Sequence, residues 1–155
     1  MIGVFRRDDL PRGTRDVTLA LWHVGDPGNV GTLVRTADAF GAGVALSEEC
    51  ADPVGPRALR ASAGAVFRVP LAAWGEPPGR RIALVAHGGE PLSTVTVEPP
   101  VIFLLGAERE GLPEELVARS DEAVTIPLPG DAESLNVAAA GAIALYELSR
   151  RSTAI

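Results

Sequence analysis

The chain has 155 residues, of which 46% are apolar and 22% charged, a composition typical of one soluble globular domain with a sizeable core. Twenty acidic against fourteen basic side chains give a formal charge of −6, which excludes a basic nucleic-acid coat protein. Any contact with RNA or DNA must therefore be local. All the basic side chains are arginine, which stays charged and can bind a phosphate through two hydrogen bonds.

A Cys/His zinc centre and a membrane span are both excluded by composition. The single Cys50 and two histidines cannot form an internal disulfide or a Cys/His zinc cluster, so we expect no metal. The most apolar stretches, Val101 to Ala107 and Val137 to Tyr146, are far shorter than the roughly 20 residues that span a bilayer. With no apolar run of signal-peptide length near Met1, we expect a cytoplasmic protein with no membrane partner.

Short apolar runs alternate with helix-like segments along the chain, which predicts an α/β fold with a mostly parallel sheet and helices on both faces. The predicted strands are Val17 to Trp22, Gly43 to Ser47, Ala65 to Val69, Ile82 to Ala86, Val101 to Leu105 and Ala123 to Ile126. The predicted helices are Asn29 to Phe40, Pro56 to Ser62, Pro113 to Arg119 and Leu135 to Arg150. The segment Trp74 to Arg80 is predicted to be a loop between two halves of one domain.

The last predicted helix is apolar almost all round, from Val137 to Tyr146. Such a helix must be covered on every side, which favours a dimer interface in a domain of this size. Alanines and Gly141 would allow another helix to approach closely. The alternative is a central helix buried within one subunit.

Three loops rich in glycine or proline each follow a predicted strand and lead into a helix. They span Asp26 to Asp38, Leu104 to Pro113 and Ile126 to Val137. Ligands in open α/β sheets collect at the carboxyl ends of strands, so the three loops indicate one site. A nucleotide-phosphate site is not indicated, because the chain has no Walker lysine and Gly41-Ala42-Gly43 lacks the rest of a dinucleotide fingerprint.

Each loop also has a purely structural interpretation. Asn29 has the character of a helix cap, with Arg35 an ordinary surface side chain on the same helix. Ser134 or Asn136 would likewise cap the last helix. Cys50 is interpreted as a plain loop or core cysteine, because no partner motif accompanies it.

Taken in order, the three loops resemble the three motifs of the SpoU family of RNA ribose 2′-O-methyltransferases, within the SPOUT class. The resemblance covers roughly residues 17 to 148, and Arg60-Ala61-Ser62-Ala63-Gly64-Ala65 resembles a further stretch between the first two motifs. The positions that match the three motifs are Asn29 and Arg35, then Gly106 and Glu108, then Ile126-Pro127 with Ser134-Leu135-Asn136.

The resemblance implies a parallel sheet whose C-terminal part forms a deep trefoil knot, and a homodimer packed through the terminal helix. It also implies that S-adenosylmethionine lies in the knot, bound by three loops. The implied cofactor-binding residues are Ala86, His87, Gly88, Leu105, Gly106, Ala107, Glu108, Ile126, Leu128, Leu135 and Asn136. His87 could equally be a partly buried polar spacer.

The implied reaction is transfer of a methyl group from sulfonium to a ribose 2′-hydroxyl, an in-line displacement that needs placement and loss of the hydroxyl proton. The family assigns activation of the hydroxyl to the arginine at position 35. Because a guanidinium stays protonated, we interpret Arg35 as a fixed charge that stabilises the developing alkoxide and binds phosphate. Asn29, Glu108, Ser134 and Asn136 would orient Arg35 and the ribose.

The expected partner is structured RNA, either tRNA or ribosomal RNA. Arg35, Arg57, Arg60 and Arg109 would line its groove, although Arg57 and Arg109 could equally be ordinary solvated side chains. We expect residues 1–16 to be an extension or linker remnant and residues 17–155 the catalytic domain, of either a minimal enzyme or a longer one.

Two alternative functions stay open at this point. One is a non-catalytic knotted module that binds the cofactor or RNA and needs a partner or an RNA-binding domain. The other is a small-molecule nucleotide enzyme with a doubly wound sheet.

Overall fold

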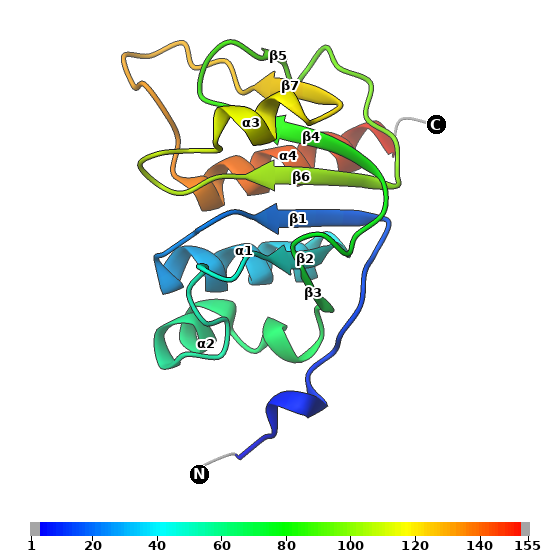
Figure 1. Cartoon of the computed structure of the whole chain (residues 1–155), viewed down its shortest axis with the longest axis vertical. Helices are drawn as coiled ribbons and strands as arrows, with labels where there is room; N and C mark the ends of the chain where they lie inside the picture. Colours follow the sequence, from blue (N-terminus) through cyan, green and yellow to red (C-terminus); the bar gives the residue numbers. More distant parts are fainter. Residues whose placement is uncertain (1–3, 153–155) are drawn as a thin grey trace.

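The structure is a computed structural model that describes residues 4–152. Its centre is a seven-stranded sheet in the order β3-β2-β1-β6-β4-β7-β5, and every pair of neighbouring strands is parallel (Figure 1). The strands are β1 Val17–Leu21, β2 Gly43–Leu46, β3 Leu71–Ala73, β4 Arg80–Leu84, β5 Glu90–Pro91, β6 Val101–Leu105 and β7 Glu122–Thr125. The α-helices are α1 Pro27–Ala39, α2 Pro56–Ser62, α3 Glu114–Ala118 and α4 Val137–Ser152, with short 3-10 helices at Arg7–Asp9 and Ala65–Phe67.

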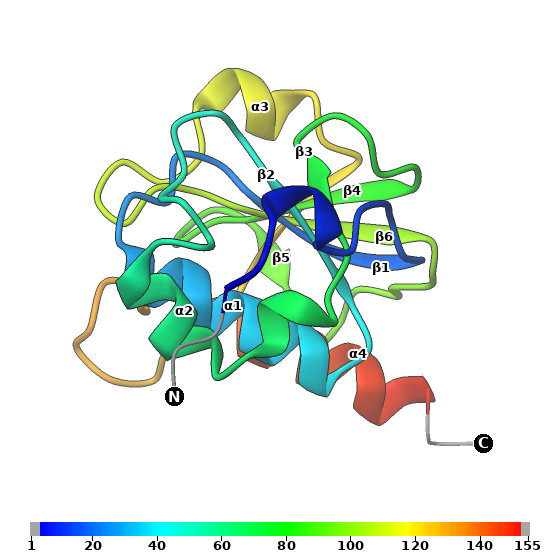
Figure 2. The ribbon, with the colours of Figure 1, turned by 90° about the horizontal axis from the view of Figure 1, so that it is seen from below.

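Helices cover both faces of the sheet, which confirms the predicted α/β class. Figure 2 shows α3 on one face and α1, α2 and α4 on the other. Successive strand residues point to opposite faces, so Leu19 and Leu21 join the large core under α1 and α4. Ala20 faces the other way, into a small cluster with Ala45 and Leu104 on the side of α3.

One predicted strand is wrong. Residues Ala65 to Val69 form a 3-10 helix and its end, and the third strand of the chain lies just beyond, at Leu71–Ala73. Ala65, Val66 and Val69 are buried while residues 67 and 68 are exposed. That spacing is helical and does not alternate as a half-buried strand does, which is why the apolar run misled the prediction. The two-residue strand β5 was not predicted either.

The terminal helix α4 is buried on one side only, so the alternative of a central buried helix is wrong. Ala144 and Leu145 lie in the core, whereas Ile143 is 38% exposed and Tyr146 58% exposed. The predicted close approach at Gly141 occurs within the chain, because a Cβ there would lie 2.5 Å from Leu33 of α1. The outer apolar face has no covering element among residues 4–152.

The long loop between β4 and β6 wraps the far edge of the sheet (Figure 1). It adds β5 beside β7, and a Cβ at Gly89 would lie 2.6 Å from the backbone of Val124. Loop and strand are therefore in contact without room for a side chain. The trefoil knot that the resemblance implies stays a prediction. None of the helices within residues 4–152 has the length and hydropathy to cross a bilayer.

Candidate active site

A cavity of about 590 Å³ lies where β4, β6 and β7 end, beside the start of α4. It has the size of small-molecule sites and the position where ligands bind in parallel sheets. Leu84, Leu128 and Ala140 supply apolar wall, and the loop from residue 105 to 112 supplies backbone and charged groups. The second and third predicted motif loops thus meet in one place.

Most of the predicted cofactor-binding residues line this cavity. They are Ala86, His87, Leu105, Gly106, Ala107, Glu108, Ile126, Leu128, Leu135 and Asn136. Gly88 is not part of the wall. It turns the loop after β4 through a positive φ of 78°, so its place in the loop is explained by backbone conformation.

Glu108 holds the loop that precedes α1. Its carboxylate accepts hydrogen bonds from the backbone amides of Gly25 (3.2 Å) and Asp26 (3.0 Å) and from Asn29 Nδ2 (3.1 Å). One side chain of the second motif therefore ties down the first motif. The three donors belong to the loop and first turn of α1, so their positions depend on one acceptor.

Asn29 and Asn136 extend this contact into a directed chain. Glu108 offers only acceptors, so Asn29 must turn its NH₂ toward it and present Oδ1 to Asn136, whose Nδ2 donates at 3.0 Å. Asn136 Oδ1 then accepts from the amides of Ala138 and Ala139 at the start of α4. The hydrogen-bonding partner of each side-chain amide sets its orientation, and this series of hydrogen bonds links all three motifs.

The hydrogen bonds also shift the titration of Glu108. Burial of the carboxylate by itself raises its pKa, but the bonds from Asn29, Asp26 and Gly25 together outweigh burial. The pKa of Glu108 is therefore held below its ordinary value of 4.5. At neutral pH the group is a carboxylate that acts as a fixed acceptor, and it is not poised as a general acid.

The cap of α1 is Asp26, which corrects the structural interpretation of Asn29. The Asp26 carboxylate accepts from the Asn29 amide at 3.0 Å, and Pro27 occupies the first helical position. The Asn29 side chain is thereby left for Glu108 and Asn136. Asp26 also pairs with Arg57 of α2 at 3.2 Å, so the predicted RNA contact Arg57 is engaged within the chain.

The remaining predicted residues lie at the rim or outside the cavity. Ser134 and Arg109 line it and are exposed. Arg35 is exposed on the third turn of α1 and Arg60 on α2, and neither lines the cavity. Among the described residues, the side chains of Arg35, Arg60 and Arg109 have no ion-pair partner. Three guanidinium groups are thus available to an external anion.

Gly106 is required by a close approach of two backbones. A Cβ at this position would lie 2.1 Å from the carbonyl carbon of Gly111, where the loop folds back through an Ala107 to Gly111 bridge. Any larger residue would open the loop. The position therefore shapes the wall, and its substitution would disturb the loop before it filled the cavity.

The sequence analysis missed the roles of Asp26 and of an aromatic group beside the site. An acidic residue directly before a Pro-Gly helix start is a cap signal that could have identified Asp26. The aromatic group consists of Trp22, His23 and Trp74, in which Trp22 stacks on His23 with ring centroids 4.2 Å apart. Because Trp22 and Trp74 are 52 positions apart in the sequence, no local pattern reveals their contact.

Comparison with known proteins places the chain among RNA methyltransferase sequences. An uncharacterized tRNA/rRNA methyltransferase of Mycobacterium avium is 35% identical over 144 residues, covering 86% of this chain and 47% of that protein. A similar protein of Synechocystis is 35% identical over 147 residues, covering 88% of this chain and 54% of the relative. The chain therefore spans about half the length of these relatives.

Solved structures give the same result. The AdoMet-bound rRNA methyltransferase of Sinorhizobium meliloti superposes with a TM-score of 0.82 and 37% identity, over 92% of this chain and 59% of that one. AviRb of Streptomyces viridochromogenes in complex with AdoMet gives a TM-score of 0.83 at 27% identity, over 99% of this chain and 64% of that one. A structure described as giving insight into the 2-OH methylation of C/U34 on tRNA gives 0.83 at 32% identity, over 90% and 97% of the two chains.

A family model gives the same assignment as the relatives and the solved structures. The model of the SpoU rRNA methylase family matches residues 16–146, which include every strand of the sheet and most of α4. The chain belongs to the SpoU rRNA methylase family.

Proposed function

We propose that this protein is an S-adenosylmethionine-dependent RNA methyltransferase that modifies a ribose 2′-hydroxyl in tRNA or ribosomal RNA. The observation that carries the proposal is the chain from Glu108 through Asn29 to Asn136, which joins the three motif loops at a cavity of small-molecule size. The relatives described as AdoMet-bound support the choice of cofactor. The relative described by 2-OH methylation on tRNA supports the choice of reaction.

The cavity residues fit S-adenosylmethionine in chemistry and in size. Leu105, Ile126 and Leu135 offer an apolar surface for an adenine ring, and backbone groups of the loop at residues 106–108 offer hydrogen-bonding partners. The carboxylate of Glu108 already accepts three hydrogen bonds, so in this proposal its role is to set the wall of the cavity. When bound, the cofactor supplies an electrophilic methyl group.

The chain's own residues would place the ribose and stabilise its oxygen. Ser134 lies exposed at the rim, where its hydroxyl is free to bond a ribose, and Asn136 is fixed beside it by the cap of α4. Arg35 does not line the cavity, so in this proposal its guanidinium acts from outside on the RNA beyond the rim. A permanent cation there would favour the alkoxide, and the hydroxyl proton would pass to solvent water and not to Arg35.

The same proposal covers partners and organisation. RNA is the substrate, bound in part by Arg60 and Arg109, and a second copy of the chain covers the exposed apolar face of α4 to form a homodimer. Residues 17–155 form the methyltransferase unit, with residues 1–16 as an extension. We place the reaction in the cytoplasm.

The test measures methyl transfer from radiolabelled S-adenosylmethionine to total tRNA and ribosomal RNA, followed by nuclease digestion to locate the label on ribose or base. We expect ribose label with the natural chain. Arg35→Ala should lower the turnover by about 10²- to 10³-fold, as loss of one charge-stabilising donor does. Binding of S-adenosylmethionine should stay unchanged, because Arg35 is outside the cavity.

Arg35→Lys is the matched control, since it keeps the positive charge and should retain part of the activity. Label on a base, or undiminished transfer by Arg35→Ala, would contradict the proposed reaction or the role of Arg35. Binding of cofactor and RNA without transfer would identify the protein as a non-catalytic module.

A further inference from the structure

Three aromatic rings form a continuous row on the α3 side of the sheet. Trp22 follows β1 and stacks on His23 at 4.2 Å with an angle of 13° between the rings, and Trp74 meets Trp22 edge-on at 5.1 Å. All three are only partly buried, and the His23 side chain is 34% exposed. They are therefore held in a fixed arrangement with part of their surface open.

The row is held in place by backbone and side-chain contacts. His23 has a φ of 51°, unusual for a residue with a side chain, and its amide donates to Ser47 Oγ at 2.9 Å. Its Nδ1 lies 3.1 Å from the carboxylate of Glu49. The conformation that strains the backbone is also the one that brings the His23 ring against Trp22. Strain of this kind persists where surrounding contacts fix it, and often at functional positions.

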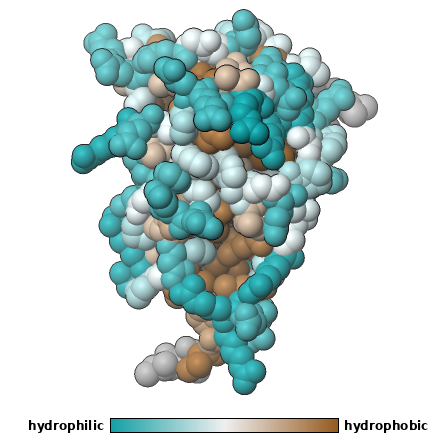
Figure 3. All heavy atoms as spheres, in the orientation of Figure 1, coloured by the Kyte–Doolittle hydropathy of each residue, from teal (hydrophilic) through white to brown (hydrophobic). Residues whose placement is uncertain are grey.

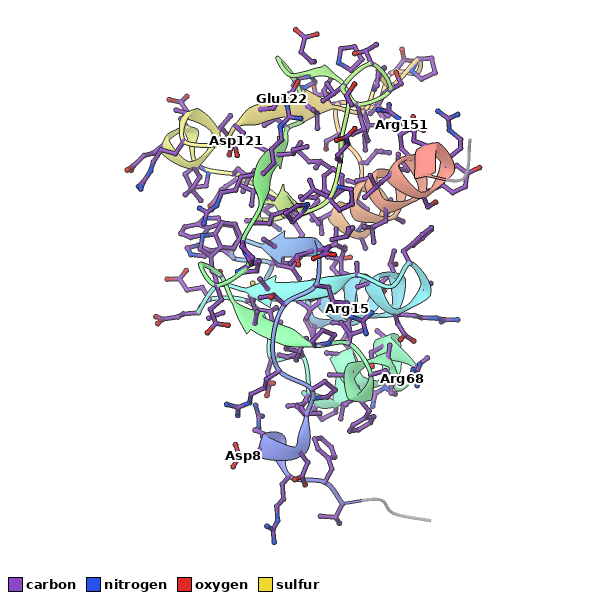
Figure 4. All side chains as sticks on the ribbon, turned by 90° about the vertical axis from the view of Figure 1, so that its right-hand side faces the viewer. Asp8, Arg15, Arg68, Asp121, Glu122 and Arg151 are labelled. Carbon is purple, nitrogen blue, oxygen red and sulfur yellow. The ribbon has the colours of Figure 1, made fainter. Side chains whose placement is uncertain are left out.

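A second cavity of about 450 Å³ begins at the end of this row. Trp74 is one wall, and Leu104, Leu116, Arg81 and Arg119 are others. Arg119 is exposed and lies 3.7 Å from Glu115, a loose ion pair that leaves most of its donors free. Figure 3 looks onto this side of the molecule and shows apolar residues at the surface among hydrophilic ones. Figure 4 shows Asp121, another wall residue, beside α3 and far from Arg151 of α4.

The aromatic row lies beside the candidate active site, and the second cavity extends from Trp74 toward Gly79, Arg81 and Asp121 at the amino-terminal ends of β4 and β7. The Trp22 amide donates to the carbonyl of Leu105, a wall residue of the first cavity. Leu112 lines the first cavity and, like Trp74, packs against the apolar cluster that contains Leu104. Leu104 and Trp74 are both walls of the second cavity. Trp22 is therefore joined by its backbone to a wall residue of the first cavity.

From this arrangement we infer that the Trp22–His23–Trp74 row and the cavity beside Trp74 bind unpaired bases of the RNA that flank the target nucleotide. The inference rests on the proposed function, since it takes RNA as the substrate. Bases of any sequence stack on aromatic rings, and guanidinium groups stack on bases and bind phosphate. Stacking also suits a chain with a net charge of −6, because contact between rings and bases needs no excess of positive charge.

The test uses the tryptophans themselves, because the chain has only two and both lie in the row. Tryptophan fluorescence is followed while nine-nucleotide single strands of poly(U) or poly(A) are added, with the poly(A)–poly(U) duplex as comparison. We expect the single strands to quench the fluorescence and the duplex to do so far less.

Three variants separate stacking from fold. Trp74→Leu should weaken single-strand binding about tenfold, as loss of one stacked base does, whereas Trp74→Phe keeps a ring and should restore most of the affinity. Phe67→Leu removes an exposed ring that pairs with Phe5 away from the row and should change nothing. In methyl transfer, Trp74→Leu should raise KM for RNA and leave kcat and cofactor binding unchanged.

The outcomes distinguish this inference from the proposed function. Methyl transfer to RNA without fluorescence quenching, and with equal KM in Trp74→Leu, overturns the stacking row and leaves the reaction intact. Quenching that Trp74→Leu abolishes, in a protein that transfers no methyl group, supports the row and overturns the reaction. Equal quenching by duplex and single strand also overturns the inference, since paired bases cannot stack on the rings.

Discussion

The two ends of helix α4 are both tied to loops through side chains, but with different consequences. At the first end Asn136 caps the helix and donates to Asn29, so the helix start is joined to the motif loops around the cavity. At the last end Arg151 donates to the carbonyls of Leu92 and Val95 and pairs with Glu147. Figure 4 shows Arg151 at that far end.

The difference lies in what each end holds. Leu92 and Val95 are buried and do not line the cavity, so Arg151 fastens an apolar loop onto the core and contributes mainly to stability. Asn136 is exposed beside a cavity and its partner Asn29 is only partly buried, so the hydrogen bond between their side chains should contribute little to stability. The same helix therefore has a stabilising end and a site-forming end, and substitutions should separate the two.

The largest effect is expected from Glu108→Ala at the site-forming end. Three donors lose their acceptor, and each buried or half-buried donor left unpaired costs about 1–3 kcal/mol, partly offset where water reaches it. The loops should loosen, with cofactor binding and methyl transfer reduced by at least tenfold. Glu108→Gln keeps one acceptor oxygen and should lose less in calorimetric titration, and equal losses in the two variants would count against a network role.

At the stabilising end, Arg151→Ala should lower the free energy of unfolding by about 1–2 kcal/mol, because two backbone carbonyls lose a charged donor. Arg150→Ala is the matched control, since Arg150 pairs with the same Glu147 but with no described backbone group. It should leave stability nearly unchanged, because its ion pair is exposed to solvent. Urea denaturation measures both, and cofactor binding that fell in Arg151→Ala at low temperature would contradict the separation of the two ends.

A smaller and more selective effect is expected from Asn136→Asp. The carboxylate still accepts from Ala138 and Ala139 and so keeps the cap, but it cannot donate to Asn29 Oδ1. Stability should change by less than about 1 kcal/mol, since the lost bond is exposed. Methyl transfer should fall several-fold, which is more than so small a change in stability explains. Asn136→Ala loses both the cap and the hydrogen bond to Asn29, so its stability and its methyl transfer should both be lower than those of Asn136→Asp.

The smallest effect is a pH dependence. The folded pKa of Glu108 lies below its ordinary value of 4.5, so its contribution to stability is present above that pH and is lost as the pH falls through the folded pKa. The pKa of Glu147, at the other end of α4, is also lowered, by hydrogen bonds from Arg150 and Arg151. Glu108→Gln should therefore reduce the fall in the free energy of unfolding that occurs below about pH 4.5. Near neutral pH, the dependence of that free energy on pH should be the same as in the natural chain. Urea denaturation at a series of pH values measures this dependence. If the free energy of unfolding varied with pH identically in Glu108→Gln and the natural chain, the lowered pKa of Glu108 would be contradicted.

Much of the fold followed from local signals, and the exceptions have physical causes. Parallel strands buried on both faces appear as apolar runs, which is why Val101 to Leu105 was predicted with its observed bounds. The run from Ala65 to Val69 is equally apolar, but its burial follows helical spacing after the left-handed turn at Ala63 and Gly64. The two-residue β5 has no pattern of its own and exists only because the loop lies against β7.

For the site, motif order predicted the residues but not their contacts. Asn29, Glu108 and Asn136 are separated by up to 107 positions, and only the sheet topology brings them within hydrogen-bond distance. Arg57 was grouped with Arg60 by position, yet it pairs with Asp26, a contact that depends on how α2 packs against α1. Side-chain pairing across elements was the information that the sequence pattern lacked.

The account depends most directly on whether the cavity at the ends of β4, β6 and β7 takes S-adenosylmethionine. Calorimetric titration with S-adenosylmethionine and its demethylated product should give binding of both by the natural chain. Leu135→Trp, which places a large ring at a 36% exposed wall position without touching the tight turn at Gly106, should weaken both at least tenfold. Absence of binding by the natural chain, or equal binding by the variant, would contradict the assignment of this cavity.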